Sequence, residues 1–109
     1  WLQLGGHADG NKDLVSVALK EAKEESGFNN FTLLSNEIFD LDIHKIEPMG
    51  GRSKHLHYDV RFILEANPSK NKIIVSDESH DVKWIPLEDV AKYNSERSIN
   101  RMVAKTIEF

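Results

Sequence analysis

The chain contains no cysteine, and it has no apolar run long enough to cross a bilayer. The first absence excludes disulfides and thiolate metal sites, and it fits a reducing compartment such as the cytoplasm. The second argues against a transmembrane helix, and no signal-peptide pattern is present. Basic residues are also the minority, at 14 against 18 acidic residues. We therefore expect neither a membrane nor nucleic acid as a partner.

The 109 residues are 39% hydrophobic and 29% charged, a composition typical of a globular chain. This length is enough for one small domain and too short for two, so we predict a single domain over residues 1–109. The chain begins at Trp1 inside an apolar run that leads to Gly5 and Gly6. From this start we expect that one or more N-terminal strands are missing.

Residues 14–26 are predicted to form a helix, because apolar residues recur there at helical spacing. Asp13 is a candidate N-cap and Gly27 a candidate C-cap. The recurring apolar positions are Leu14, Val17, Ala18 and possibly Ala22, and we expect Leu14, Val17 and Ala18 to face inward. Two more helices are predicted near the end of the chain, over residues 88–93 and from Ser95, a possible N-cap, to Phe109.

Several segments have the composition of strands, and turn residues separate them. They are residues 1–4, a strand that begins at Phe39, residues 55–64, 72–75 and 82–87. Strands of this kind between helices favour an α/β (α+β) fold with a mixed sheet and helices packed on its faces.

The segment 55–64 alternates most clearly between apolar and polar residues, so one face should meet the core and the other a polar environment. The polar face carries His55, His57, Asp59 and Arg61. One interpretation is that this face lines a substrate cleft, with Arg61 available to a phosphate. Plain solvent exposure and a zinc site at His55 and His57 are the alternatives.

Three glutamates, Glu21, Glu24 and Glu25, follow one another at i, i+3 and i+4 in the predicted helix 14–26. Like charges at this spacing destabilise a helix, and acidic residues in its last turn oppose its dipole. They could form a solvated face on which Lys20 pairs with Glu24. They could also form an oxygen-rich site for a hard divalent cation such as Mg²⁺ or Mn²⁺.

The segment around these glutamates favours the metal site. Residues 5–28 resemble the signature of the Nudix hydrolases and read "GGHADGNKDLVSVALKEAKEESGF". That signature is written G-x5-E-x7-R-E-U-x-E-E-x-G-U, with U an apolar residue. The alignment needs no gap, and its central part is intact. The matching positions are Gly6, Glu21, Ala22, Glu24, Glu25, Gly27 and Phe28, with Lys12 and Lys20 in place of the family's glutamate and arginine.

The resemblance implies a Nudix-type α/β/α sandwich that hydrolyses a nucleoside diphosphate linked to another moiety, with Mg²⁺ or Mn²⁺ as cofactor. It implies that Glu21, Glu24 and Glu25 are metal ligands, and that Glu24 and Glu25 are also catalytic. Gly6 would bring the backbone close to the phosphates. Lys20 keeps the charge of the family's arginine without its planar fork, so we expect a looser loop and a retained metal site.

Many members of the family add a ligand or general base from a loop outside the signature. The acidic segment "SDESHD" before "VKWIPL" is the candidate, with Glu78 as the first choice for a catalytic role and His80 as the second. Asp77 and Asp81 are weaker candidates. For substrate binding we expect contributions from Gly6, His7, Lys20, His57, Arg61 and His80. Trp84 is expected to pack in the core rather than to stack on a base.

Two other functions stay open on this sequence. Lys12 and Lys20 favour a non-catalytic Nudix-fold module that binds or senses a nucleotide. A structural domain whose acidic helix contacts a basic partner is the other. The expected partner is a small nucleoside diphosphate derivative, and an open sheet edge would also allow a homodimer.

Overall fold

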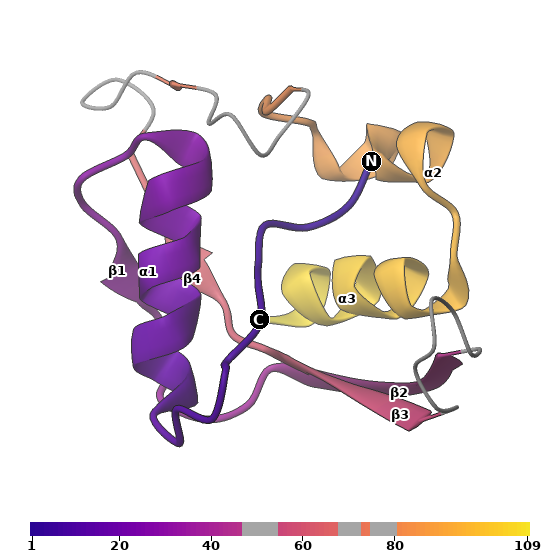
Figure 1. The fold of residues 1–109 in the computed structure, drawn as a ribbon. Helices are drawn as coiled ribbons and strands as arrows, with labels where there is room; N and C mark the ends of the chain where they lie inside the picture. Colours follow the sequence, from indigo (N-terminus) through magenta and orange to yellow (C-terminus); the bar gives the residue numbers. More distant parts are fainter. Residues whose placement is uncertain (47–54, 68–72, 75–80) are drawn as a thin grey trace.

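The computed structural model describes residues 1–46, 55–67, 73–74 and 81–109. Helix α1 stands beside the short strands β1 and β4, and α3 lies above the longer hairpin of β2 and β3 (Figure 1). The elements in chain order are α1 (Leu14–Ser26), β1 (Thr32–Leu33), β2 (Asp40–Ile46), β3 (His55–Arg61), β4 (Leu64–Glu65), the 3-10 helix η1 (Leu87–Asp89), α2 (Val90–Tyr93) and α3 (Arg97–Glu108).

Helix α1 has the predicted limits, and both predicted caps are confirmed. The Asp13 side chain accepts a hydrogen bond from the Ser16 amide at 3.1 Å, which satisfies a free donor of the first turn. Gly27 adopts the left-handed conformation, with φ of 76°, and its amide donates to the Lys23 carbonyl. An added Cβ at Gly27 would lie 2.5 Å from the Ile74 Cβ, so a side chain has no room there. The helix end is therefore set by local residues that the sequence shows directly.

The strands form two separate antiparallel pairs. β2 pairs with β3 over seven residues, with His44 opposite His57 and Asp42 opposite Asp59. β1 pairs with β4 over two residues. The α+β class is confirmed, but the described part of the chain holds these two antiparallel pairs in place of the expected single mixed sheet.

Two predicted strands are wrong, and a third is only partly described. Residues 1–4 form no strand; instead the Trp1 carbonyl accepts a hydrogen bond from the Asn94 side chain at 2.7 Å. Residues 82–87 form no strand, and η1 begins at the last of them. Within 72–75 only residues 73–74 are described, and the Ile74 amide donates to the Ser26 carbonyl at 2.7 Å. These apolar runs pack against helices, because apolar composition favours burial without specifying a strand partner.

A strand is confirmed over His55–Arg61 of the predicted 55–64, but the expected core contact of its apolar face is wrong for Leu56 and Tyr58. Leu56 and Tyr58 keep 49% and 59% of their surface exposed, while Arg61 on the polar face is buried. β2 follows the same pattern, with Leu41 and Ile43 about half exposed and Asp40 only 2% exposed. Helix α3 covers the polar face near Asp40, so polar groups meet at this contact.

A buried ion cluster joins α3 to the hairpin. Arg101 donates two hydrogen bonds to the Asp40 carboxylate, at 2.7 and 2.8 Å, and Lys105 donates a third at 2.6 Å. Arg61 donates a fourth from β3 at 2.9 Å. These hydrogen bonds, that of Arg101 first, hold the pKa of Asp40 far below its ordinary value, against the opposing effect of burial. Asp40 is therefore ionised at neutral pH and fixes α3 on the hairpin.

The C-terminal helices are close to prediction. η1 and α2 together span the expected helix 88–93, and α3 runs almost to the last residue. Its start differs, because the N-cap position is Glu96 and Ser95 does not cap it. None of the helices in the described ranges is long and apolar enough to span a membrane.

Candidate active site

The loop before α1 turns back on itself through a tight turn. Asp9 and Gly10 both have positive φ, at 51° and 85°, and the Asn11 amide donates to the Ala8 carbonyl at 3.0 Å. Positive φ at both central residues is the mark of a type I′ turn, which suits aspartate and glycine. The turn lets the chain approach α1 at Gly5 and Gly6 and still reach the start of the helix.

Gly6 lies directly against the Glu21 carboxylate. A Cβ at this position would lie 2.5 Å from Cδ and 2.6 Å from Oε2 of Glu21, closer than real contacts allow. The neighbouring Gly5 amide donates to Oε2 of Glu25 at 3.4 Å. The loop backbone thus contacts two of the three predicted metal ligands, and a side chain at position 6 would displace the Glu21 carboxylate from its present place.

Glu24 lies at the more exposed side of this cluster. Its side chain is 55% exposed, and the Lys20 Nζ lies 3.9 Å from Oε1. Lys20 is itself 68% exposed, so water screens the pair and its contribution to stability is small, at most about 1 kcal/mol. The pairing of Lys20 with Glu24 expected for a solvated face is therefore present.

Three glutamates on one helix provide the oxygen ligands that Mg²⁺ and Mn²⁺ prefer, but among the described residues only His44, His57 and Asp59 bring three possible ligand atoms within 4.8 Å of one another. Glu21 and Glu25 are half-buried, Glu24 is exposed, and the glycine loop lies on two of them. The donor chemistry and the close backbone approach both fit a divalent cation that bridges the helix and a phosphate.

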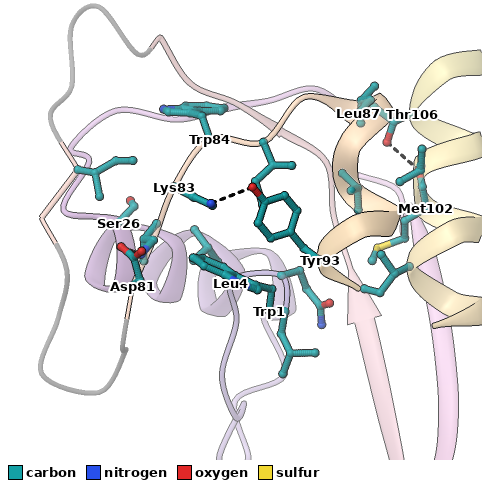
Figure 2. Close-up of a pocket in the computed structure, with 18 of the residues that line it drawn as sticks. Trp1, Leu4, Ser26, Asp81, Lys83, Trp84, Leu87, Tyr93, Met102 and Thr106 are labelled. Atoms are coloured by element: carbon teal, nitrogen blue, oxygen red, sulfur yellow. Dashed lines mark hydrogen bonds between the residues drawn. The ribbon is translucent and has the colours of Figure 1, made fainter. Parts of the chain in front are cut away.

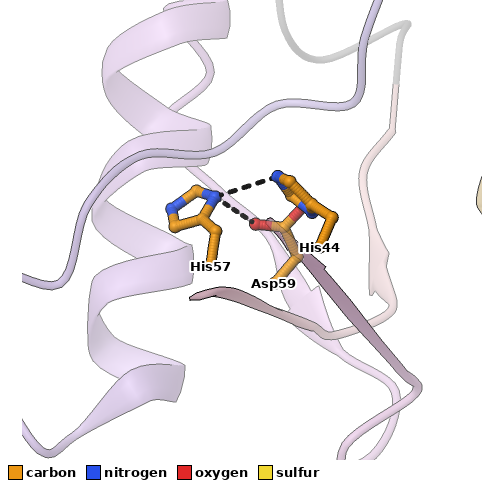
Figure 3. A group of neighbouring side chains, drawn as sticks. All are labelled: His44, His57 and Asp59. Carbon is orange, nitrogen blue, oxygen red and sulfur yellow. Dashed lines mark hydrogen bonds and ion pairs between the residues drawn. The ribbon is translucent and has the colours of Figure 1, made fainter. Parts of the chain in front are cut away.

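His7 links this loop to the β2–β3 hairpin. Its ring lies 5.8 Å from the ring of His57, in an edge-to-face arrangement. His57 in turn approaches His44 and Asp59, and the three side chains converge from the two strands (Figure 3). Gly6, His7 and His57, three of the predicted substrate-binding residues, thus lie in one continuous region.

Arg61 does not lie where the sequence predicted it. Its side chain is only 9% exposed, and its guanidinium donates to Asp40 and, at 3.3 Å, to the Ser98 hydroxyl. Its Nε is buried without a hydrogen-bond partner. The expectation that Arg61 stands on a wet face, available to a phosphate, is corrected by this position, because α3 covers that end of the strand.

The segment expected to supply a further catalytic group is mostly outside the described residues. Glu78, His80 and Asp77 belong to it, so their roles stay predictions. Asp81 is described and exposed, and its carboxylate accepts a hydrogen bond from the Val82 amide at 2.8 Å. This contact is a local turn contact and does not by itself indicate catalysis.

A mainly apolar cavity of about 380 Å³ lies between the N-terminal segment, the end of α1 and the helices α2 and α3 (Figure 2). Lys83 reaches over the Tyr93 ring, 4.3 Å from its centroid, and donates to the Tyr93 hydroxyl at 2.9 Å. Trp84 lines the cavity but keeps 56% of its surface exposed, so the expected core packing is only partial. Its ring lies 5.9 Å from that of Phe28.

Two groups of interacting side chains were not predicted from the sequence. One is the Asp40 cluster with Arg101 and Lys105, and the other is the pairing of His57 with His44. Both join residues far apart in the chain, and the register of a hairpin cannot be read from composition alone. Aspartate and histidine recur at every second position in both strands, and this pattern was the only feature of the sequence that could have indicated that these side chains meet.

A glycine loop laid against a glutamate-bearing helix, within a small α+β domain, is the arrangement that defines a Nudix-type hydrolase. The NUDIX domain family matches residues 1–105, and the chain belongs to this family. It is a hydrolase of this general kind, in a family that generally uses divalent metals. A search of the curated proteins finds no match.

Proposed function

We propose that the chain hydrolyses the diphosphate linkage of a nucleoside diphosphate joined to another moiety, with water as the nucleophile and Mg²⁺ or Mn²⁺ as cofactor. The observation that carries this proposal is the contact of the Gly6 backbone with the Glu21 carboxylate. Family membership supports a pyrophosphatase-type reaction on an acid anhydride.

Glu21, Glu24 and Glu25 would hold the cation. When bound, it would neutralise charge on the phosphates and help to activate water. Glu25 already accepts a hydrogen bond from the Gly5 amide, which fixes its carboxylate under the loop. Glu24 is the more exposed of the two proposed catalytic glutamates, so it is the better placed to meet incoming substrate.

The loop and its neighbours would bind the rest of the diphosphate. Because position 6 carries no side chain, main-chain groups can come close to the phosphates beside the carboxylates. Lys20 places a positive charge on the same helix face, while His7 in the loop and His57 beside it offer imidazole nitrogens. Glu78, with His80 as the second choice, is the proposed general base or further ligand.

Replacement of single glutamates tests the mechanism. Glu24→Gln and Glu25→Gln should each reduce turnover by at least about 10³-fold, because groups that act as a unit fail together. The double variant should be no worse than either single variant. Release of a phosphate monoester from a panel of nucleoside diphosphate derivatives, with and without Mg²⁺, provides the measurement.

Glu108→Gln is a matched control, because Glu108 is an exposed glutamate on helix α3, far along the chain from the signature. It should leave turnover unchanged. Wild-type rates in Glu24→Gln or Glu25→Gln, or equal rates without metal, would overturn the proposed mechanism.

A nucleotide-binding module without turnover is the second candidate. The position of Lys20 beside Glu24 favours it, since a positive charge near the glutamates weakens their attraction for a cation. Calorimetric titration of a nucleoside diphosphate derivative separates the two functions. Binding with no release of monophosphate at any Mg²⁺ concentration would support the module.

A further inference from the structure

A group of imidazole and carboxylate side chains lies on the β2–β3 hairpin, apart from the signature glutamates. One ligand atom can be chosen from each of His44, His57 and Asp59 so that all three lie within 4.8 Å of one another. In Figure 3 the two rings and the carboxylate point toward a common centre. Antiparallel register explains the grouping, since His44 is directly opposite His57 and Asp59 is two residues along the same face.

We propose that His44, His57 and Asp59 form a second metal site, selective for Zn²⁺ and related first-row transition metals. Two imidazole nitrogens and one carboxylate oxygen are ligands that suit these ions. Mg²⁺ prefers oxygen ligands alone, so it should favour the glutamate helix. Ligand chemistry thus separates the two sites.

The distances fit such an ion. The Nδ1 of His57 lies 3.3 Å from the Nε2 of His44 and 3.4 Å from the Oδ1 of Asp59. Two ligand atoms bound about 2.0–2.1 Å from one tetrahedral metal lie about 3.3–3.4 Å apart. Two of the three separations therefore already have the required length, and a small rotation of His44 or Asp59 closes the third.

Neighbouring charges hold the ligands in place. The other ring nitrogen of His44, Nδ1, lies 3.6 Å from Oδ2 of Asp42 and 3.9 Å from Oδ2 of Asp59, and a carboxylate that closes to hydrogen-bond distance there would orient a metal-bound imidazole. Arg61 lies 3.7 Å from Oδ2 of Asp59, which leaves Oδ1 toward His57. Asp42 and Asp59 are also directly opposite each other; Arg101 and Arg61 already offset part of this repulsion, and a cation between the strands would offset more of it.

The histidines are accessible to an ion from solution. The side chains of His44 and His57 are 43% and 38% exposed, and Asp59 is 26% exposed. Because water can fill the remaining positions, the site resembles an open metal site more than a closed structural one. The sequence pointed to His55 as the zinc partner of His57, but the hairpin places His44 there.

Titration of the untagged full chain with Co²⁺ tests the proposal, because Co²⁺ replaces Zn²⁺ and its visible absorption reports nitrogen ligands and low coordination number. We expect one equivalent to bind with a visible band. His44→Gln, His57→Gln and Asp59→Asn should each raise the Kd by at least about 100-fold, since loss of orienting contacts alone costs 10- to 100-fold. Asp42→Asn should raise it by about 10-fold.

The double variant Glu24→Gln/Glu25→Gln should keep both the visible band and the affinity for Co²⁺. The test of the second metal site is therefore independent of whether the chain hydrolyses a diphosphate. Glu65→Gln, an exposed strand carboxylate, is the matched control and should also keep them. Circular dichroism in EDTA checks that each variant folds, and added Zn²⁺ should raise the Tm of the wild type but not of His44→Gln.

Two results would overturn the proposal. One is equal Co²⁺ binding by the wild type and both histidine variants. The other is Co²⁺ binding that is lost in the double variant Glu24→Gln/Glu25→Gln and kept in the histidine variants. Either result would mean that His44 and His57 merely share a hydrogen bond across the hairpin.

Discussion

Gly6 is the residue at which sequence pattern and structure agree most closely. The resemblance to the Nudix signature singles it out, and the structure provides the reason, since any side chain would overlap the Glu21 carboxylate. Its neighbour Gly5 is in open space, with nothing within 4 Å of an added Cβ. Adjacent glycines thus differ, since a side chain at position 6 would meet the Glu21 carboxylate and one at position 5 would meet nothing within 4 Å.

This difference gives a prediction. Gly6→Ala should lower the rate of diphosphate hydrolysis by roughly 10- to 100-fold, because a methyl group displaces the Glu21 carboxylate by about 1 Å. The fold should survive, since the end of a flexible side chain can move aside. Rates of phosphate monoester release and thermal unfolding curves measure the two effects.

Gly5→Ala is the matched control and should leave the rate within about twofold of wild type. Equal losses in the two variants would show that loop flexibility, and not the contact with Glu21, sets the rate.

Other residues show where local reasoning holds and where it fails. Asp13 and Gly27 cap α1 as predicted, because a cap depends on atoms within a few residues. Arg61 was expected on an open face, yet it is buried against Asp40 and Ser98. Its position depends on a helix 36 or more residues away in the chain, which nothing in the neighbouring sequence indicates.

At the scale of elements, one carboxylate connects β2, β3 and α3. Asp40 is held by Arg61 from one strand and by Arg101 and Lys105 from the helix. Its pKa is lowered, so its contribution to stability is present above the ordinary aspartate pKa of about 3.9 and is lost as pH falls below that value. Protonation of Asp40 should therefore release α3 in acid.

Asp40→Asn should destabilise the domain by about 3–5 kcal/mol at pH 7, because it leaves three cations around a neutral amide. The variant should also lose the part of the acid sensitivity that comes from this group. Chemical denaturation of both proteins between pH 3 and pH 7 measures the effect, and the two free energies of unfolding should converge toward pH 3.

Asp89→Asn, which removes the half-buried partner of the exposed Lys92, is the control and should change stability by less than about 1 kcal/mol. A constant gap between wild type and Asp40→Asn at every pH would show that this carboxylate does not titrate with folding.

Helices were predicted better than strands for a physical reason. A helix satisfies its hydrogen bonds within one segment, so residues 14–26 and the C-terminal helix could be located from spacing and caps. A strand needs a partner from elsewhere in the chain. Residues 1–4 and 82–87 have the composition of strands but pack beside helices instead.

At the scale of the whole molecule, the polar face of the β2–β3 hairpin is covered near Asp40, while its apolar side chains are largely exposed. Leu41, Ile43, Leu56 and Tyr58 are about half exposed or more, while Asp40 and Arg61 are buried. The buried apolar side chains of the described residues are Ala22, Phe28 and Ile99, on α1, after it and on α3. The apolar interior therefore lies between the helices, and a charged contact joins them to the hairpin.

This arrangement predicts opposite responses to two substitutions. Ile99→Ala removes a side chain that is 7% exposed, and it should destabilise the domain by about 2–5 kcal/mol. Leu56→Lys alters a side chain that is 49% exposed, and it should change stability by no more than about 0.5 kcal/mol. Urea denaturation of each variant provides the comparison.

Leu56→Ala serves as the size-matched control for Ile99→Ala and should be nearly neutral. A large loss of stability in Leu56→Lys would contradict this view and place β3 with its apolar face in the core, as the alternation alone suggested.

The sequence by itself determined the Nudix family, the limits and caps of α1, and the row Glu21, Glu24 and Glu25, because each depends on residues a few positions apart. Only the tertiary structure decided that Gly6 contacts Glu21, that Arg61 is buried, and that His44 faces His57. Those contacts depend on hairpin register and on the docking of α3, and both are set by interactions between distant segments of the chain.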